Sequence, residues 1–117
     1  ATQAVYRGGM KPPKIISVPF LIPPWATGQT IHPRVILVKK YKGAIPIGVV
    51  AHELVHVEQM KRFGYLPFLI RYFRNHFRFG YKNNPFEQEA RKESLSISTW
   101  DKANALIKAQ GLESIWL

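Results

Sequence analysis

The sequence predicts a single α+β domain, and three observations support that fold class. First, the chain has 117 residues, enough for one modest hydrophobic core but too few for two. Second, 46% of the residues are hydrophobic, an ordinary share for a globular protein that excludes a wholly disordered polycation. Third, one short β-branched run is typical of a strand, whereas three later segments carry the start signals or the periodicity of helices. No repeat or Gly/Ser linker divides the chain, so residues 1–117 form one predicted domain.

The first third of the chain is predicted to be mostly extended. Residues 1–14 are basic and rich in glycine and proline, so we expect an irregular N-terminal arm. Residues 15–25 are apolar but contain three prolines, which fit neither a helix nor a central strand. We therefore expect an extended segment that packs across the core. After a turn at residues 26–29, Val35–Val38 is the best strand in the sequence because it is short, apolar and β-branched.

A helix is predicted between Pro46 and Gly64. Proline is favoured in a first helical turn, Lys61 and Arg62 are suited to a last turn, and glycine commonly ends a helix. One face of this helix carries Val49, His52, His56 and Gln59.

Two further helical segments follow. Residues 66–79 combine an apolar stripe with a narrower arginine stripe. The apolar stripe is Leu66, Ile70, Phe73 and Phe77, and the arginine stripe is Arg71, Arg74 and Arg78. Asn84 is then a natural N-cap with Pro85 at the first helical position, and a helix is predicted from there through at least Leu95. The sequence leaves open whether that helix continues to Ile107 or breaks near residues 96–98.

The strongest motif is His52-Glu53-Leu54-Val55-His56, which lies within the first predicted helix. Histidines at positions i and i+4 lie one turn apart on the same face, close enough to hold one metal ion. Glu53 is rotated by about 100° from His52, so it can reach a water on the metal without being a ligand. This arrangement suits the activation of water, because the metal lowers the pKa of the water and the carboxylate takes its proton.

A catalytic zinc needs a third protein ligand and an open position. The chain has no cysteine, and no third histidine follows within six residues of His56. Glu87 and Glu89 begin a separate helix, which can cross the histidine face and present one carboxylate. Asn84 and Glu87 also have the spacing of a capping box, and acids are favoured in a first helical turn, so spacing alone leaves both interpretations of Glu87 open.

HELVH followed by NPFEQEA resembles the gluzincins, the zinc peptidases whose third ligand is a glutamate. It is most similar to the very small minigluzincin-like proteins of bacteria and phages, over roughly residues 27–91. In that family the ligand glutamate opens an E-x-x-A signature, which matches Glu87. The resemblance implies a minimal zincin-like domain with a short edge strand in a small sheet, an HExxH helix and a second helix with the glutamate. It implies one Zn²⁺ per chain held by His52, His56 and Glu87, with Glu53 as general base and Glu89 as the alternate ligand.

The resemblance also implies a substrate-binding strand and an oxyanion donor. Val35–Val38 is expected to be the edge strand that holds an extended substrate along the cleft. A tyrosine or histidine is expected to donate to the oxyanion; Tyr81 is preferred, and Tyr72 and His76 are the alternatives. Arg91 stands where relatives often carry an aspartate that orients a ligand histidine, so the chain departs from the family pattern there.

Positive charge is the most unusual bulk property, with a formal net charge of +10 at pH 7. Between Gln59 and Phe86 the chain has basic and aromatic residues but no acid. This segment fits either an anionic membrane or other phosphates, or else a packed helix with one solvated arginine stripe. No nucleic-acid-binding motif is present, so the charge alone does not indicate nucleic acid as a partner.

Composition excludes several other classes. Without cysteine, a disulfide scaffold, a thiolate nucleophile and Cys-ligated metal sites are excluded. No apolar run approaches the roughly 20 residues that span a bilayer, and no signal-peptide pattern is visible, so the compartment stays open.

The sequence therefore predicts a zinc metallopeptidase that cleaves peptide bonds in a peptide, a protein or a peptidoglycan stem, near an anionic membrane or cell envelope. The alternative is a non-catalytic zinc protein that uses its basic aromatic surface on an anionic membrane, an envelope polymer or nucleic acid. The oligomeric state is not predicted.

Overall fold

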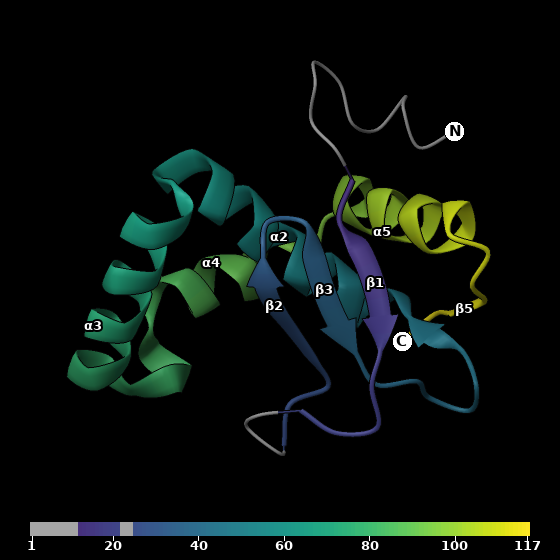
Figure 1. Cartoon of the computed structure of the whole chain (residues 1–117), viewed down its shortest axis with the longest axis horizontal. Coiled ribbons are helices and arrows are strands. Elements are labelled where there is room, and N and C mark those ends of the chain that lie inside the picture. The colour runs from purple at the N-terminus through teal and green to yellow at the C-terminus, as the bar shows by residue number, and fades with distance from the viewer. Residues whose placement is uncertain (1–11, 22–24) are drawn as a thin grey trace.

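The computed structural model describes residues 12–21 and 25–117, and these form an α+β domain with four helices and small sheets (Figure 1). The elements in chain order are β1 (Lys14–Ser17), β2 (Gly28–His32), β3 (Val35–Val38), β4 (Ile45–Pro46), α2 (Ile47–Phe63), α3 (Tyr65–Asn83), α4 (Pro85–Glu93), α5 (Ile97–Ala109) and β5 (Ser114–Ile115). The predicted α+β class is confirmed at this level of detail.

Three strands form the main sheet in the order β1-β3-β2, and β4 pairs separately with β5. β3 pairs in parallel with β1 and antiparallel with β2. Val35–Val38 is therefore a strand, as predicted, but the prediction that it is an edge strand is wrong. Residues 14–17 lie between prolines and are free to pair, so β1 covers one side of β3, and the strand at the edge beside α2 is β2.

The hydrophobic core lies between the sheet, α2 and α5. β3 contributes Ile36 and Val38, which are fully buried because alternate residues of this strand point inward. α2 contributes Ile47 and Val50, and the buried side chains of α5 include Leu106 and Ile107. Figure 1 shows the three strands side by side over α2, with α3 at one end of the molecule and α5 with β5 at the other. The HExxH helix is thus anchored on both sides.

The predicted N-terminal arm is only partly described. Residues 1–11 of the expected arm at 1–14 lie outside the described residues. Pro13 is fully buried, and Lys14 begins β1, so the last part of the expected arm is ordered structure instead. The reason is that Gln110, just beyond α5, donates to the Pro13 carbonyl and accepts from the Ile15 N–H.

The helix starts are close to the predictions, but one end differs. α2 ends at Gly64, whose φ of 87° suits glycine, and Asn84 caps α4 by accepting from the Phe86 N–H. α4 ends at Glu93, so the prediction that it reaches Leu95 is wrong. The chain breaks there because the Ser96 side chain accepts from the Thr99 N–H and starts α5 as a separate helix.

α3 is confirmed as a helix, but its apolar stripe does not pack. Leu66, Ile70, Phe73 and Phe77 are all exposed. The face that packs instead presents Phe68, which is 2% exposed and contacts the ring of Phe86 at a centroid distance of 4.9 Å. The interpretation of this segment as a packed helix with only an arginine stripe in solvent is therefore wrong.

Candidate metal centre

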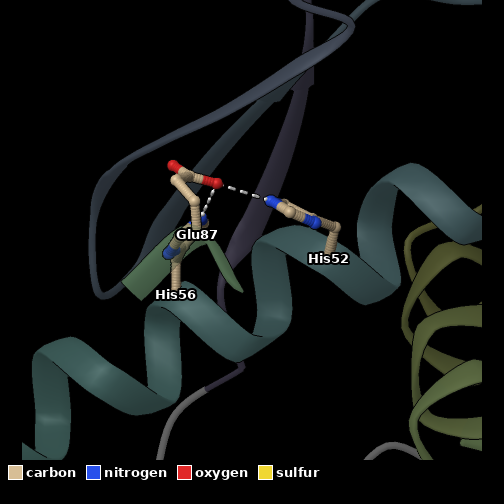
Figure 2. A group of neighbouring side chains, drawn as sticks. All are labelled: His52, His56 and Glu87. Carbon is tan, nitrogen blue, oxygen red and sulfur yellow. Dashed lines mark hydrogen bonds and ion pairs between the residues drawn. The ribbon is translucent and has the colours of Figure 1, made fainter. Parts of the chain in front are cut away.

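Two histidines and one glutamate converge on a single point beside α2. His52 and His56 project from the same face of α2, with ring centroids 5.0 Å apart. Their Nε2 atoms lie 3.0 Å and 3.1 Å from the same carboxylate oxygen, Oε1 of Glu87, and Figure 2 shows this oxygen facing both rings. The three residues form a group that can hold a metal ion, because their ligand atoms all lie within 4.8 Å of one another.

The spacing of these atoms fits a small divalent cation. Tetrahedral ligands at about 2.0–2.1 Å from zinc lie about 3.3 Å from one another, close to the observed nitrogen–oxygen distances. Two imidazoles and one carboxylate are also a common donor set for catalytic zinc. The residues present therefore fit the expected group.

The start of α4 brings Glu87 to the histidines. Asn84 is fully buried; its Oδ1 accepts from the Phe86 N–H, and its Nδ2 donates to the Tyr72 carbonyl on α3. Glu87 follows on the first turn of α4 and points at α2. The capping-box interpretation of Glu87 is wrong, because the Asn84 N–H donates to the Tyr81 carbonyl.

Glu89, the alternate third ligand, does not reach the metal group. Its carboxylate accepts from the Gln59 amide at 2.9 Å and from the Arg62 guanidinium at 2.6 Å. The hydrogen bond from Gln59, helped by the one from Arg62, outweighs the effect of partial burial and holds the pKa of Glu89 below its usual value. Glu89 is linked by hydrogen bonds to the ligand His56 through Gln59.

Gln59 fixes the state of His56, and the sequence analysis assigned it no role. Its Nε2 donates to the Phe86 carbonyl and to Glu89, so its Oε1 faces His56 Nδ1 at 2.8 Å. The Nδ1 of His56 must therefore carry the proton, which leaves the Nε2 lone pair for a metal. The signal in the sequence was the position of Gln59 three residues after His56, on the same helical face.

The hydrogen bond between His56 and Gln59 also explains how the site can do without an aspartate at position 91. Arg91 contacts neither histidine, because its side chain donates to the Lys82 carbonyl. A neutral amide from α2 accepts from the ligand histidine, so an acid on α4 is not needed for that purpose.

Without an ion, the group is held together by charge. Burial disfavours protonation of His56, but the hydrogen bond to Glu87 and the charges of Glu53 and Glu87 outweigh it and raise its pKa to about 9. Burial likewise favours a neutral Glu87, yet the hydrogen bonds from His52 and His56 keep its pKa far below the usual range. The site is therefore built to hold positive charge next to an ionised carboxylate.

Tyr72 and Tyr81, two of the three oxyanion candidates, occupy different places. The Tyr72 hydroxyl donates to Oε2 of Glu87 at 2.5 Å, so it holds the oxygen that the histidines leave free. Burial and this hydrogen bond raise the pKa of Tyr72. Tyr81 lines the cleft, as Tyr72 also does; burial and the charges of Glu87 and Glu53 raise the pKa of Tyr81 to about 12, so it keeps its proton. His76, the third candidate, is an exposed residue on the cleft wall.

Glu53 lies on the wall of an open cleft of about 610 Å³. The cleft is lined by side chains from β2, α2, α3 and α4, among them Thr30, Glu53, His56, Tyr81 and Glu87. Glu53 is buried, and the Thr30 hydroxyl lies 2.8 Å from its Oε1 and 3.1 Å from its backbone carbonyl. Gly28 allows this approach of β2, because a Cβ there would lie 2.5 Å from Val49 Cγ1 and 3.1 Å from Glu53 Cγ.

The five predicted site residues thus occupy one region. His52, His56 and Glu87 form the metal group, and Glu53 and Tyr81 line the adjoining cleft. Comparison of the chain with protein-family models, curated proteins and solved structures found no match. The chemistry of this site is therefore what indicates the function of the protein.

Proposed function

We propose that the protein is a zinc metallopeptidase of minimal zincin-like architecture. The observation that carries the proposal is that Glu53 lines the same cleft as His56 and Glu87. A structural zinc site is closed by four protein ligands, whereas a catalytic site keeps one position open. Among the described residues the group contains three ligands, and two of them, His56 and Glu87, line the cleft.

Zinc is the metal that the donor set favours. Two imidazole nitrogens and one carboxylate oxygen suit a borderline metal, and magnesium or calcium prefers oxygen ligands throughout. We expect one Zn²⁺ per chain, held by His52, His56 and Glu87. When bound, the ion supplies Lewis-acid polarisation at the open position.

The residues around that position have separate roles in the proposed hydrolysis. Glu53 takes a proton from the attacking water and then delivers it to the leaving amine. Thr30 orients the Glu53 carboxylate through its hydroxyl. Tyr81 donates a hydrogen bond to the carbonyl oxygen as the peptide carbon becomes tetrahedral. These roles require a protonated Tyr81 and an ionised Glu53.

The class of substrate is suggested by the edge strand that lines the cleft. β2 is the edge strand beside Glu53, and the backbone groups of an edge strand pair with an extended chain. We therefore propose an extended peptide as substrate, from a peptide, a protein or a peptidoglycan stem.

The first experiment measures zinc and turnover in the same preparation. Elemental mass spectrometry of tag-free protein after dialysis should give about one zinc per chain. On a mixture of fluorogenic peptides, Glu53→Gln should lower turnover by about 10²- to 10⁴-fold and retain the zinc. Glu58→Gln, an exposed acid on the same helix, is the matched control and should keep full turnover. Full activity in Glu53→Gln would contradict the mechanism, and failure to take up zinc would contradict the site.

A second candidate function is a non-catalytic zinc protein that acts through its basic aromatic surface. The exposed apolar stripe of α3, beside its arginines, favours it. In that case wild-type protein would hold zinc without hydrolysing any peptide, and Glu53→Gln would leave its function intact.

A further inference from the structure

The outer face of α3 is apolar and has nothing packed on it among the described residues. Leu66, Ile70 and Phe77 are 66%, 68% and 87% exposed, and Phe73 is 53% exposed. The four lie at helical spacing on one stripe of the helix. Figure 1 places α3 at one end of the molecule, away from α5 and β5. Soluble proteins rarely expose such a contiguous stripe unless it binds something.

A row of arginines borders this stripe. At about 100° per residue, Arg71, Arg74 and Arg78 centre roughly 100° around the helix from the apolar stripe. None of the three takes part in an ion pair within the described residues, where the pairs join His52 and His56 to Glu87, and Arg62 to Glu89. Arg71 and Arg78 lie instead over the rings of Phe63 and Phe79. Their charges are free to meet an external anion.

We propose that α3 binds flat on an anionic lipid bilayer. The apolar stripe enters the boundary between head groups and acyl chains, and the arginines contact lipid phosphates beside it. α3 carries no acidic residue that would oppose this contact. No helix in the described part of the chain combines the length and apolarity needed to cross a membrane, so the contact is with the surface.

The charge of α3 favours a bilayer over two other binding partners, a second copy of the chain and nucleic acid. If a second copy packed on the stripe, two arginine rows would be brought together without acids between them. Nucleic acid would satisfy the arginines but not four exposed apolar side chains. An anionic bilayer complements both features at once.

The same helix forms one wall of the cleft. Phe68, Leu69, Tyr72 and Phe73 line it, and Phe73 also belongs to the exposed stripe. Binding through α3 therefore places the cleft beside the bilayer surface. Membrane binding by α3 is independent of the proposed peptidase activity, because the binding face contains neither the metal ligands nor Glu53.

The test is co-flotation with vesicles of phosphatidylcholine alone and of phosphatidylcholine mixed equally with phosphatidylglycerol. We expect binding to the mixed vesicles that weakens as salt is raised, with little binding to phosphatidylcholine. Replacing Arg71, Arg74 and Arg78 by Gln should weaken binding by about a hundredfold, at roughly fivefold per arginine. Ile70→Ser combined with Phe77→Ser should weaken it at least about tenfold.

Matched controls separate this face from general effects. Leu95→Ser with Ile97→Ser changes two residues that are as exposed, at 78% and 80%, but lie outside α3. Replacing Lys92, Lys102 and Lys108 by Gln removes the same charge elsewhere on the surface. Both control proteins should bind the mixed vesicles like the parent.

Three results would overturn the proposal. Equal binding to both vesicle types would exclude recognition of anionic lipid. A dimer in light scattering that Phe77→Ser disrupts, without vesicle binding, would assign the stripe to a second copy. A monomer that binds neither vesicle type would show that the stripe serves another partner. Zinc content and peptide turnover are measured in parallel, so a failure here is distinguishable from failure of the proposed peptidase.

Discussion

The inner and outer sides of α3 illustrate two ways in which a small protein uses its surface. On the inner side, buried polar atoms have named partners, as in the contacts of Tyr72 to Glu87 and of Asn84 to the Tyr72 carbonyl. On the outer side, apolar side chains face solvent, and the arginines have no acidic partner in the described structure. The difference teaches that the polar groups on the inner side are paired within the chain, whereas nothing among the described residues covers the apolar outer side.

Two phenylalanines on α3 provide the sharpest test of that comparison. Phe68 is 2% exposed and Phe77 is 87% exposed. Phe68→Ala should lower the free energy of unfolding by about 3–5 kcal/mol, because it opens a cavity against Phe86. Phe77→Ala should change it by less than about 0.5 kcal/mol. Guanidinium denaturation of both variants measures the difference, and equal losses would mean that the outer face is also packed.

The site on the inner side should be sensitive to a residue that never touches the metal. Gln59→Leu removes the acceptor of the His56 Nδ1 proton, so zinc affinity should fall by about 10- to 100-fold. Competition with a chelator measures this affinity, with circular dichroism to show that the helices remain. Arg62→Met is the control, since it removes only an exposed ion pair to Glu89, and its effect should be about twofold or less. Unchanged affinity in Gln59→Leu would show that His56 needs no orienting partner.

A smaller effect is expected where β2 meets α2. Thr30→Val keeps the shape of the side chain but removes the hydroxyl that contacts Glu53. Turnover should fall by about tenfold through kcat, with zinc content and KM unchanged, because one hydrogen bond to a charged group is lost. Thr27→Val, at an exposed position just before β2, should have no effect. A change confined to KM would instead place Thr30 in substrate binding.

The elements that depend on local signals were predictable from the sequence. The strand Val35–Val38, the helix that ends at Gly64 and the Asn84 cap are each encoded within a few residues. The central position of β3 was not, because it depends on β1, a partner about twenty residues away in a proline-rich segment. A break near residues 96–98 was one of two open alternatives, and the sequence could not choose it because the Ser96 cap has no effect on the apolar pattern; the end of α4 at Glu93 was missed by two residues.

The candidate site divides in the same way. Helical spacing predicted that His52 and His56 share a face, but the choice between Glu87 and Glu89 needed the path of α4. Gln59 lies three residues after His56, which is a local spacing, but the orientation of its amide follows from contacts with Phe86 and Glu89, about thirty positions away, which no local pattern contains. The exposure of the α3 stripe could not be foreseen either, because an apolar stripe is the usual sign of a buried face.

Gly28 limits which amino-acid substitutions the region around Glu53 can accept. β2 and α2 pack so closely at Gly28 that even the methyl group of an alanine would overlap the Val49 side chain. Any larger residue requires the side chains of Val49 and Glu53, or β2 itself, to shift, and such a shift would disturb the contact between the Thr30 hydroxyl and Glu53. The tolerance of this side of the cleft to mutation is therefore set by Gly28, a position that has no functional group of its own.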